Sequence, residues 1–268
     1  MPTTTETPMR QLWNKVPEVT IFFWLIKILA TTVGETAADF LNFNLHFGLT
    51  GTSAVMAMLL TVFMVLQVRA KAYIPWLYWV TVVLISIVGT LVTDNLVDNL
   101  GVSLEATTAV FSVALFVTFI VWYAFEKTLS IHSIFTVRRE LFYWAAILFT
   151  FALGTAAGDL TAEGLKLGYA YSALLFGGMI AAVTAVFYLL KGNAIACFWI
   201  AYILTRPLGA SCGDLLSQSP VDGGLGLGTV ATSGIFLAAI AGLVIYLSAT
   251  RRDMEPIAIV QDEKSLAP

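Results

Sequence analysis

Apolar stretches of similar length recur along the whole chain, separated by short polar connections. A membrane-spanning helix needs about 20 apolar residues. Runs of that kind lie near residues 17–41, 52–68, 74–97, 106–125, 140–161, 170–190, 194–216 and 229–249. The connections leave no room for a separate soluble domain. The pattern therefore predicts an all-α bundle of eight transmembrane helices.

One spaced motif occurs four times in these runs. It consists of tryptophan, nine residues, glycine, four residues and aspartate, and an aromatic residue precedes each tryptophan. The copies begin 55, 65 and 55 residues apart, which indicates tandem structural repeats of two spans each. The four copies are Trp24/Gly34/Asp39, Trp79/Gly89/Asp94, Trp144/Gly154/Asp159 and Trp199/Gly209/Asp214. We place the repeats at about 16–73, 74–137, 138–192 and 193–250.

Composition agrees with a multi-pass membrane protein. The chain has 268 residues, of which 59% are hydrophobic and 12% charged, whereas soluble domains carry about 25% charged residues. Lysine and arginine gather in the N-terminal tail, in the connections between repeats and in the C-terminal tail, and only Lys166 is expected on the opposite side. Positive residues favour the cytoplasmic side. Residues 1–15 and 251–268 are therefore predicted as cytoplasmic tails.

The two-span period fixes the relative orientation of the copies. A repeat with two spans returns to its starting side, so all four copies point the same way and are related by an axis along the membrane normal. Each aspartate follows its tryptophan by fifteen residues, about 22 Å along a helix. The aspartates are thus expected at one level near the outer ends of the odd-numbered spans. Because carboxylates facing lipid are costly, we expect them to face inward.

The glycines and tryptophans have simpler structural interpretations. A small residue follows each motif glycine after four positions, a pattern typical of close helix packing in membranes. The tryptophans are expected to pack in the bundle or to donate from the indole nitrogen to a neighbouring carbonyl. The pattern leaves open whether the glycines kink the odd-numbered helices or whether glycine and aspartate serve different interfaces.

Two basic residues, Lys27 and Arg206, fall within predicted spans. A lone basic residue there costs on the order of 2.5 to 3.5 kcal/mol, so each should pair with a carboxylate of a neighbouring copy. We expect Lys27 to pair with Asp94 or Asp214, and Arg206 with Asp159 or Glu35.

The acids near this level outnumber the basic residues. The basic residues within the spans that could balance Glu35, Asp98 and the four motif aspartates are Lys27 and Arg206. Buried carboxylates left unpaired must bind cations or hold protons. Carboxylate oxygens suit hard ions such as Mg²⁺, Ca²⁺ or Mn²⁺. The four aspartates are therefore predicted metal ligands, supported by Glu35, Asp98, Lys27 and Arg206, with the cation as substrate and no cofactor assigned. Neither His46 nor His132 belongs to a paired ligand motif, and a purely structural cap remains the alternative for the aspartates.

The four spaced motifs, together with the opening segment KVPEVTIFFWLIKILATTVGETAADF, carry a family resemblance. The chain resembles, over about residues 15–250, a family of bacterial membrane proteins built from a four-times-repeated unit of unknown function. The resemblance implies the eight-span architecture and a bacterial inner-membrane location, and it supplies no substrate.

The functional hypothesis that follows is a secondary transporter for a cation, with a divalent metal favoured. A passive cation channel and a non-transporting structural or sensory membrane protein are the alternatives. No nucleophile, base and oxyanion donor stand together in the sequence, so an enzyme is not expected. The expected partners are membrane lipids and a small cation or proton, with no nucleic acid, and the oligomeric state is open.

Overall fold

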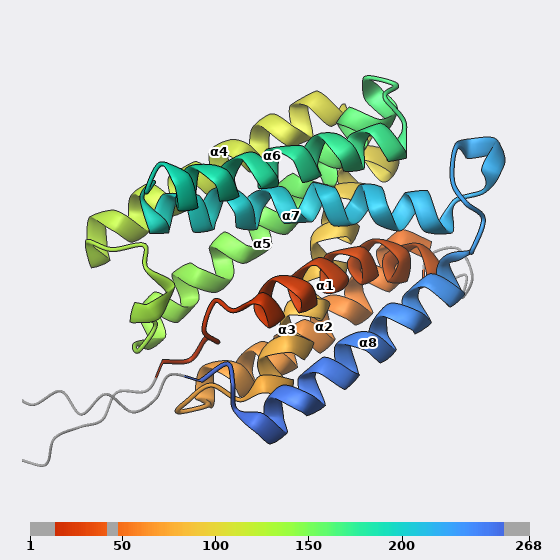
Figure 1. The fold of residues 1–268 in the computed structure, drawn as a ribbon. Coiled ribbons are helices and arrows are strands. Elements are labelled where there is room, and N and C mark those ends of the chain that lie inside the picture. The colour runs from red at the N-terminus through yellow and green to blue at the C-terminus, as the bar shows by residue number, and fades with distance from the viewer. Residues whose placement is uncertain (1–13, 42–47, 255–268) are drawn as a thin grey trace, which may run out of the picture.

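A computed structural model describes residues 14–41 and 48–254 (Figure 1). This part of the chain is helical and contains no strand, and eight of its helices are long and apolar enough to cross a membrane. They are α1 (Ile21–Asp39), α2 (Gly48–Arg69), α3 (Pro75–Asp94), α4 (Leu104–Glu126), α5 (Val137–Asp159), α6 (Tyr169–Leu189), α7 (Ala194–Ser217) and α8 (Thr229–Thr250). The predicted all-α fold with eight spans is confirmed.

The odd-numbered helices begin at residues suited to helix starts. Side-chain oxygens of Thr20, Thr136 and Asn193 accept hydrogen bonds from backbone N–H groups in the first turns of α1, α5 and α7. Helix α3 begins at Pro75, where the missing N–H has no helical partner to lose. Local sequence thus fixes where each inner helix starts.

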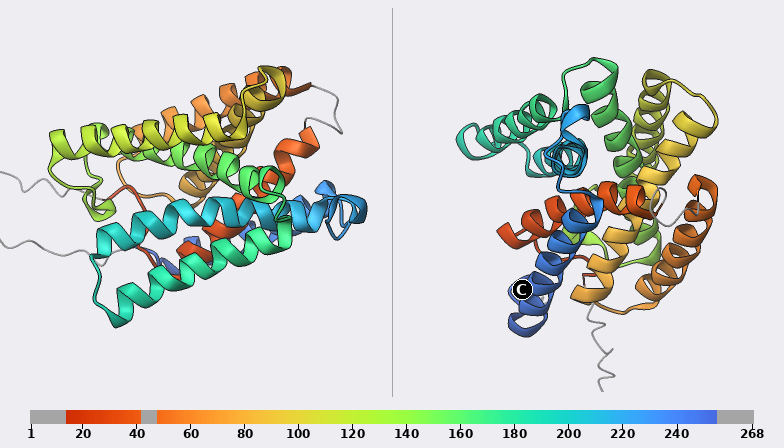
Figure 2. Two further views of the ribbon diagram at one scale, coloured as in Figure 1. Left: turned by 90° about the horizontal axis from the view of Figure 1, so that it is seen from above. Right: turned by 90° about the vertical axis from the view of Figure 1, so that its right-hand side faces the viewer.

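The eight helices form an inner ring and an outer layer. Helices α1, α3, α5 and α7 pack on one another in cyclic order, and 61% of the apolar window of each is buried. The even-numbered helices lie outside, with 11% to 28% buried. Each of them packs on the first helix of the next repeat: α2 on α3, α4 on α5, α6 on α7 and α8 on α1 (Figures 1 and 2). The ring therefore closes with pseudo-fourfold symmetry.

The four motif glycines are points of close approach between neighbouring inner helices. A Cβ atom on Gly34 would lie 1.9 Å from the Ser86 Oγ, and one on Gly209 would lie 2.0 Å from the Thr31 Oγ1. The residue met is always the seventh after the tryptophan of the next copy: Ser86 for Gly34, Phe151 for Gly89, Arg206 for Gly154 and Thr31 for Gly209. All four helices stay α-helical through the glycine. The packing interpretation is confirmed, and the glycines and aspartates serve different interfaces.

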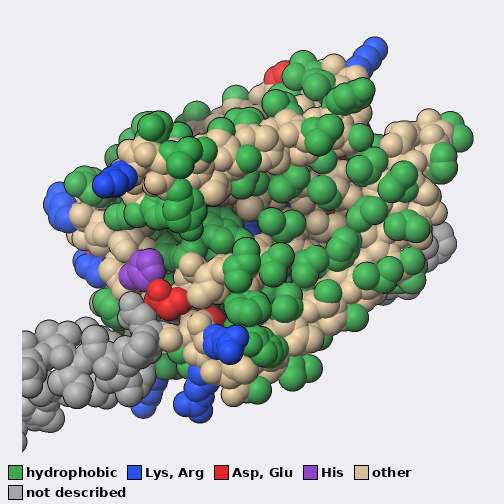
Figure 3. All heavy atoms as spheres, in the orientation of Figure 1, with side chains coloured by type: hydrophobic (Ala, Val, Ile, Leu, Met, Phe, Trp, Pro, Cys, Tyr) green, Lys and Arg blue, Asp and Glu red, His purple; other side chains and the backbone are tan. Residues whose placement is uncertain are grey.

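The two ends of the bundle differ. Both described ends of the chain lie at one end, which we call the terminal end, and the odd-numbered helices run from it to the other, which we call the pocket end (Figure 1). The flank in view in Figure 3 is largely hydrophobic, and most of the lysine and arginine visible there lies toward the terminal end. This distribution is what a membrane-spanning bundle requires.

The terminal end is closed by the segment that precedes α1. The Lys15 Nζ donates to the Glu140 Oε2 at 2.6 Å and to the Val68 carbonyl at 2.9 Å, and both charged side chains are buried. Tyr73 donates to the Asp253 carboxylate at 2.6 Å. Lys15, placed in the N-terminal tail by sequence, is thus part of the packed bundle.

Candidate functional site

The motif aspartates lie where the inner helices end. Asp39, Asp94 and Asp159 are the last α-helical residues of α1, α3 and α5. A π-helical turn follows Asp94 and another follows Asp159, at Asn95–Asn99 and Leu160–Gly164. Such turns are frequent at functional sites. Asp214 lies in the last turn of α7.

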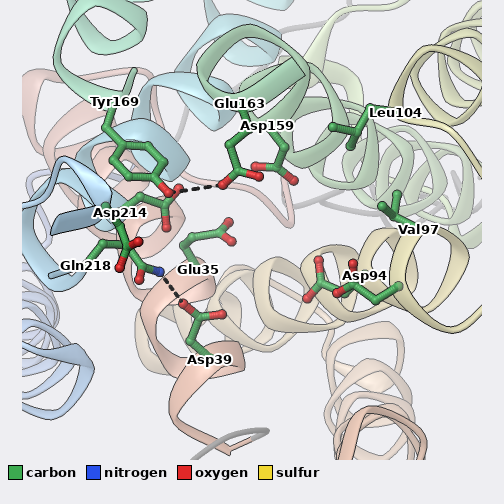
Figure 4. Close-up of a pocket in the computed structure, with 12 residues that line it drawn as sticks. Glu35, Asp39, Asp94, Val97, Leu104, Asp159, Glu163, Tyr169, Asp214 and Gln218 are labelled. Atoms are coloured by element: carbon green, nitrogen blue, oxygen red, sulfur yellow. Dashed lines mark hydrogen bonds between the residues drawn. The ribbon is translucent and has the colours of Figure 1, made fainter. Parts of the chain in front are cut away.

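A single acidic pocket joins these four ends. Its volume is about 520 Å³, and all four motif aspartates line it together with Glu35, Asp98, Glu163 and Asp222. No lysine or arginine is among the described residues that line it. Figure 4 shows Asp39, Asp94, Asp159 and Asp214 on different sides of Glu35. The structure therefore brings the four predicted ligands together with Glu35 and Asp98 in one pocket, whereas Lys27 and Arg206 do not line it.

The pocket carboxylates are only partly engaged by the protein. Gln218 donates to the Asp39 Oδ2 at 3.2 Å, and the Tyr169 hydroxyl donates to the Glu163 Oε1 at 3.0 Å (Figure 4). Asp214 is only 7% exposed and lines the pocket, and its carboxylate has no hydrogen-bond or ion-pair partner among the described residues. A buried carboxylate in this position is short of positive charge.

The floor of the pocket is an ion pair. The Arg206 Nη2 donates to the Glu35 Oε2 at 3.0 Å, so one of the two expected partners of Arg206 is confirmed. Glu35 thus belongs both to the pocket lining and to its floor.

The expected pairing of Lys27 with Asp94 or Asp214 is wrong. The Lys27 Nζ donates to the Thr205 Oγ1 at 3.1 Å and lies over the rings of Tyr202 and Phe151, at 4.0 Å and 4.4 Å from their centroids. The physical reason is depth. Lys27 precedes the aspartate of its own copy by twelve residues, or about 18 Å of helix, which is beyond the reach of its side chain.

The metal-ligand role of the four aspartates stays a prediction. Within the described ranges, no three His, Cys, Asp or Glu side chains come close enough together to hold one metal ion. His132 contacts Glu18 at 3.2 Å at the terminal end, and His46 lies outside the described residues.

The motif tryptophans have structural surroundings. Trp79, Trp144 and Trp199 are buried, and Trp24 is half-buried. The Trp199 indole donates to the Leu129 carbonyl at 2.9 Å, which confirms the donor interpretation for that copy.

Tyr169 and Gln218 are lining residues that the sequence reasoning missed. Gln218 follows Asp214 by four residues, so a search one helical turn beyond each aspartate would have found it. Tyr169 begins α6 after the Leu160–Gly164 turn, and no sequence signal placed it near the acids.

Comparison with known proteins gives a family without a function. Searches of curated proteins and of solved structures found no match. A family described as a Repeat of Unknown Function (DUF347) matches residues 22–73, 77–128, 142–193 and 197–253. These matches cover most of the chain and fall on the four two-helix units seen in the fold. The protein is an integral membrane protein that belongs to this four-repeat family.

Proposed function

We propose that this protein is a secondary transporter that carries cations across the membrane through the acidic pocket. The observation that carries the proposal is the pocket itself: eight carboxylates, four of them contributed by equivalent positions of the repeats, around one cavity of about 520 Å³. Concentrated negative charge in a cleft raises the local concentration of cations. The buried, unpartnered carboxylate of Asp214 supplies a place for one to bind.

The cargo we favour is a hard divalent cation that keeps part of its water shell. Carboxylate oxygens are the ligands that Mg²⁺, Ca²⁺ and Mn²⁺ prefer, and Mg²⁺ in particular gives up water reluctantly. The acids surround a space larger than a bare ion needs, and water would bridge the remaining distance. Asp39, Asp94, Asp159 and Asp214 are the proposed ligands.

The closed axis supports a transporter rather than a permanently open channel. Beneath the pocket, Arg206 and Phe151 are fully buried, and the hydroxyls of Tyr78 and Tyr143 hydrogen-bond to each other nearer the terminal end. A conformational change must therefore open a path before an ion can leave on that side. Such alternating exposure is how secondary transporters work.

The side to which the pocket opens follows from charge. Basic residues lie at the terminal ends of the even-numbered helices and in the adjoining connections, among them Arg69, Lys127 and Arg251. We place this end in the cytoplasm of a bacterium, with both termini inside and the pocket open to the outside of the inner membrane.

The test is cation flux into proteoliposomes containing the purified protein. We expect Mn²⁺ uptake that depends on an ion gradient, and a loss of at least tenfold when Asp214 is replaced by asparagine. The matched control is Glu105→Gln, since Glu105 is exposed near the start of α4 and lies outside the pocket lining. Its flux should equal that of the wild-type protein.

Three other results would contradict the transporter proposal. Conductance that needs no gradient of a second ion, together with unitary current steps, would identify a passive channel. Equal flux in wild-type protein and Asp214→Asn would remove the pocket from the path. Absence of flux for every cation, with melting temperature as the only property changed by the aspartate variants, would indicate a structural protein.

A further inference from the structure

The centre of the ring is occupied by one side chain that the fourfold pattern does not repeat. Arg206 is the seventh residue after the tryptophan of copy four, where the other copies carry Thr31, Ser86 and Phe151. Its side chain is fully buried. A single long cation has thus replaced a small or aromatic residue at a place where the four inner helices meet.

The guanidinium of Arg206 bonds to all three other copies. Its Nη2 has three acceptors within hydrogen-bond distance, which share its two hydrogens: Glu35 at 3.0 Å, Thr155 at 2.7 Å and the hydroxyl of Thr90. Each of these is the eleventh residue after the tryptophan of its copy. Its Nη1 donates to the Thr31 carbonyl at 2.7 Å. Because the planar guanidinium offers several donors in a fixed fork, one side chain closes the ring at this level.

This contact separates the pocket from the rest of the axis. Glu35 lines the pocket, and Arg206 lies directly behind it. The Phe151 ring comes next, with the Arg206 guanidinium carbon 5.7 Å from its centroid and the Lys27 amine 4.4 Å from it. A cation leaving the pocket toward the terminal end therefore meets the positively charged guanidinium of Arg206.

We propose that Arg206 is the inner gate of the cation path, and that a cation in the pocket opens it by competing for Glu35. The proposal rests on the function proposed above. Glu35 is the single charged partner of Arg206 among the described residues, while its other partners are neutral oxygens. A cargo cation that draws the Glu35 carboxylate toward the pocket leaves Arg206 with neutral acceptors only. The attraction between the opposite charges of Arg206 and Glu35 is then lost, so the gate is weakened when the pocket is loaded.

Competition between the cation and Arg206 for Glu35 predicts opposite changes in cation affinity for variants of Glu35 and of Arg206. With Mn²⁺ as probe and equilibrium titration of the purified protein as readout, Glu35→Gln should weaken binding at least tenfold, because the cargo loses a carboxylate. Arg206→Gln should strengthen binding at least threefold, because Glu35 is released. In the Glu35→Gln background, the same change at Arg206 should have a clearly smaller effect, since no carboxylate remains to be released.

The variants also differ in leak. Arg206→Gln should let Mn²⁺ cross proteoliposome membranes without a driving gradient of a second ion. Glu35→Gln leaves Arg206 with neutral acceptors only among the described residues, so it should leak as well, but less than Arg206→Gln, because the Arg206 side chain still occupies the axis. Should Arg206→Gln fail to fold, leak through Glu35→Gln still tests the gate, and a Glu35→Gln protein that folds and does not leak would reject it. Wild-type affinity in Glu35→Gln, or additive effects in the double variant, would overturn the gate.

The gate and the proposed function fail in different ways. If the asparagine variants of all four motif aspartates leave Mn²⁺ binding unchanged, the pocket does not bind cations. The transporter proposal and the gate proposal are then both rejected. If those four variants weaken binding while Glu35→Gln does not, the pocket stands and the gate alone is rejected.

Discussion

The terminal half and the pocket half of the bundle are built from the same repeat, but they differ in how their polar side chains are paired. In the terminal half, several polar side chains pair with one another: Lys15 with Glu140, Tyr73 with Asp253, and Tyr78 with Tyr143. In the pocket half, carboxylates from every copy gather with little compensation. The paired groups of the terminal half stabilise the fold, whereas the pocket carboxylates that lack a partner among the described residues are available to a ligand.

The copies differ in charge and size in the middle of the ring. All four copies carry aspartate at the pocket level and an aromatic residue before the tryptophan. Between these levels, Lys27, Glu35, Phe151 and Arg206 each occur in one copy only. Four identical side chains meeting on an axis would collide or leave a hole, whereas one large group fills it. Divergence of the repeats thus closes the passage that symmetry would leave open.

The largest expected loss of stability comes from removing one partner of the buried ion pair at the terminal end. Glu140→Ala leaves the Lys15 amine buried without its carboxylate, and removing one partner of a buried ion pair costs about 3 kcal/mol or more. We expect this loss in chemical unfolding of the protein in detergent micelles. Glu105→Ala, at an exposed position, should change stability little. Equal stability of Glu140→Ala and wild-type protein would show that the terminal end is not held by this pair.

The next largest expected loss of stability comes from a substitution at the close contact between neighbouring repeats. Gly209→Ala would place a Cβ 2.0 Å from the Thr31 Oγ1 and 3.0 Å from a backbone carbon, and overpacking of this kind costs about 1 to 3 kcal/mol. The matched control is Gly178→Ala in α6, where no atom lies within 4 Å of the new Cβ. The same chemical unfolding assay should separate the two variants. A stable Gly209→Ala would contradict the close approach of α7 and α1.

A smaller loss is expected from Tyr73→Phe, which leaves the buried Asp253 carboxylate without its hydroxyl donor. A hydrogen bond to a charged group is worth about 1.5 kcal/mol or more. Burial and the Asp253 carboxylate raise the pKa of Tyr73 above its usual range, so the folded state holds the neutral phenol. Its contribution is fully present below the unfolded value of about 10 and is lost as pH rises above it. The stability difference should therefore stay constant from about pH 6 to 9 and shrink at higher pH, in melting curves recorded across that series.

The smallest change in stability is expected in the pocket half. Asp214→Asn removes one of several like charges and breaks no hydrogen bond among the described residues, so the melting temperature without added cation should stay the same or rise. A large fall would mean that this aspartate supports the fold. The contrast with Glu140→Ala would then disappear.

Sequence pattern alone predicted much of this fold. Hydropathy gave the eight spans, because the bilayer sets helix length. The repeated spacing gave four like-oriented copies, and counting residues along a helix put the aspartates at one level. The small residues four apart indicated close packing, which the contacts of Gly34 and Gly209 confirm.

The partners across the ring were harder to predict. Periodicity gives depth along a helix, but it does not say which neighbour a given face meets. The packing of each even-numbered helix on the next repeat, and of α8 on α1, is a tertiary property. The cage of aromatic rings around Lys27 and the burial of Lys15 escaped prediction for the same reason. Pairing of Arg206 with Glu35 was within reach because the two lie at nearby depths in the bundle.

The most direct measurement is equilibrium binding of Mn²⁺ to the purified wild-type protein and to Asp39→Asn, Asp94→Asn, Asp159→Asn and Asp214→Asn. A pocket shared by four repeats predicts that each variant binds at least tenfold more weakly, a change of about 1.4 kcal/mol, while Glu105→Gln binds as the wild-type protein does. Wild-type affinity in all four aspartate variants would contradict a cation site at the centre of the repeats.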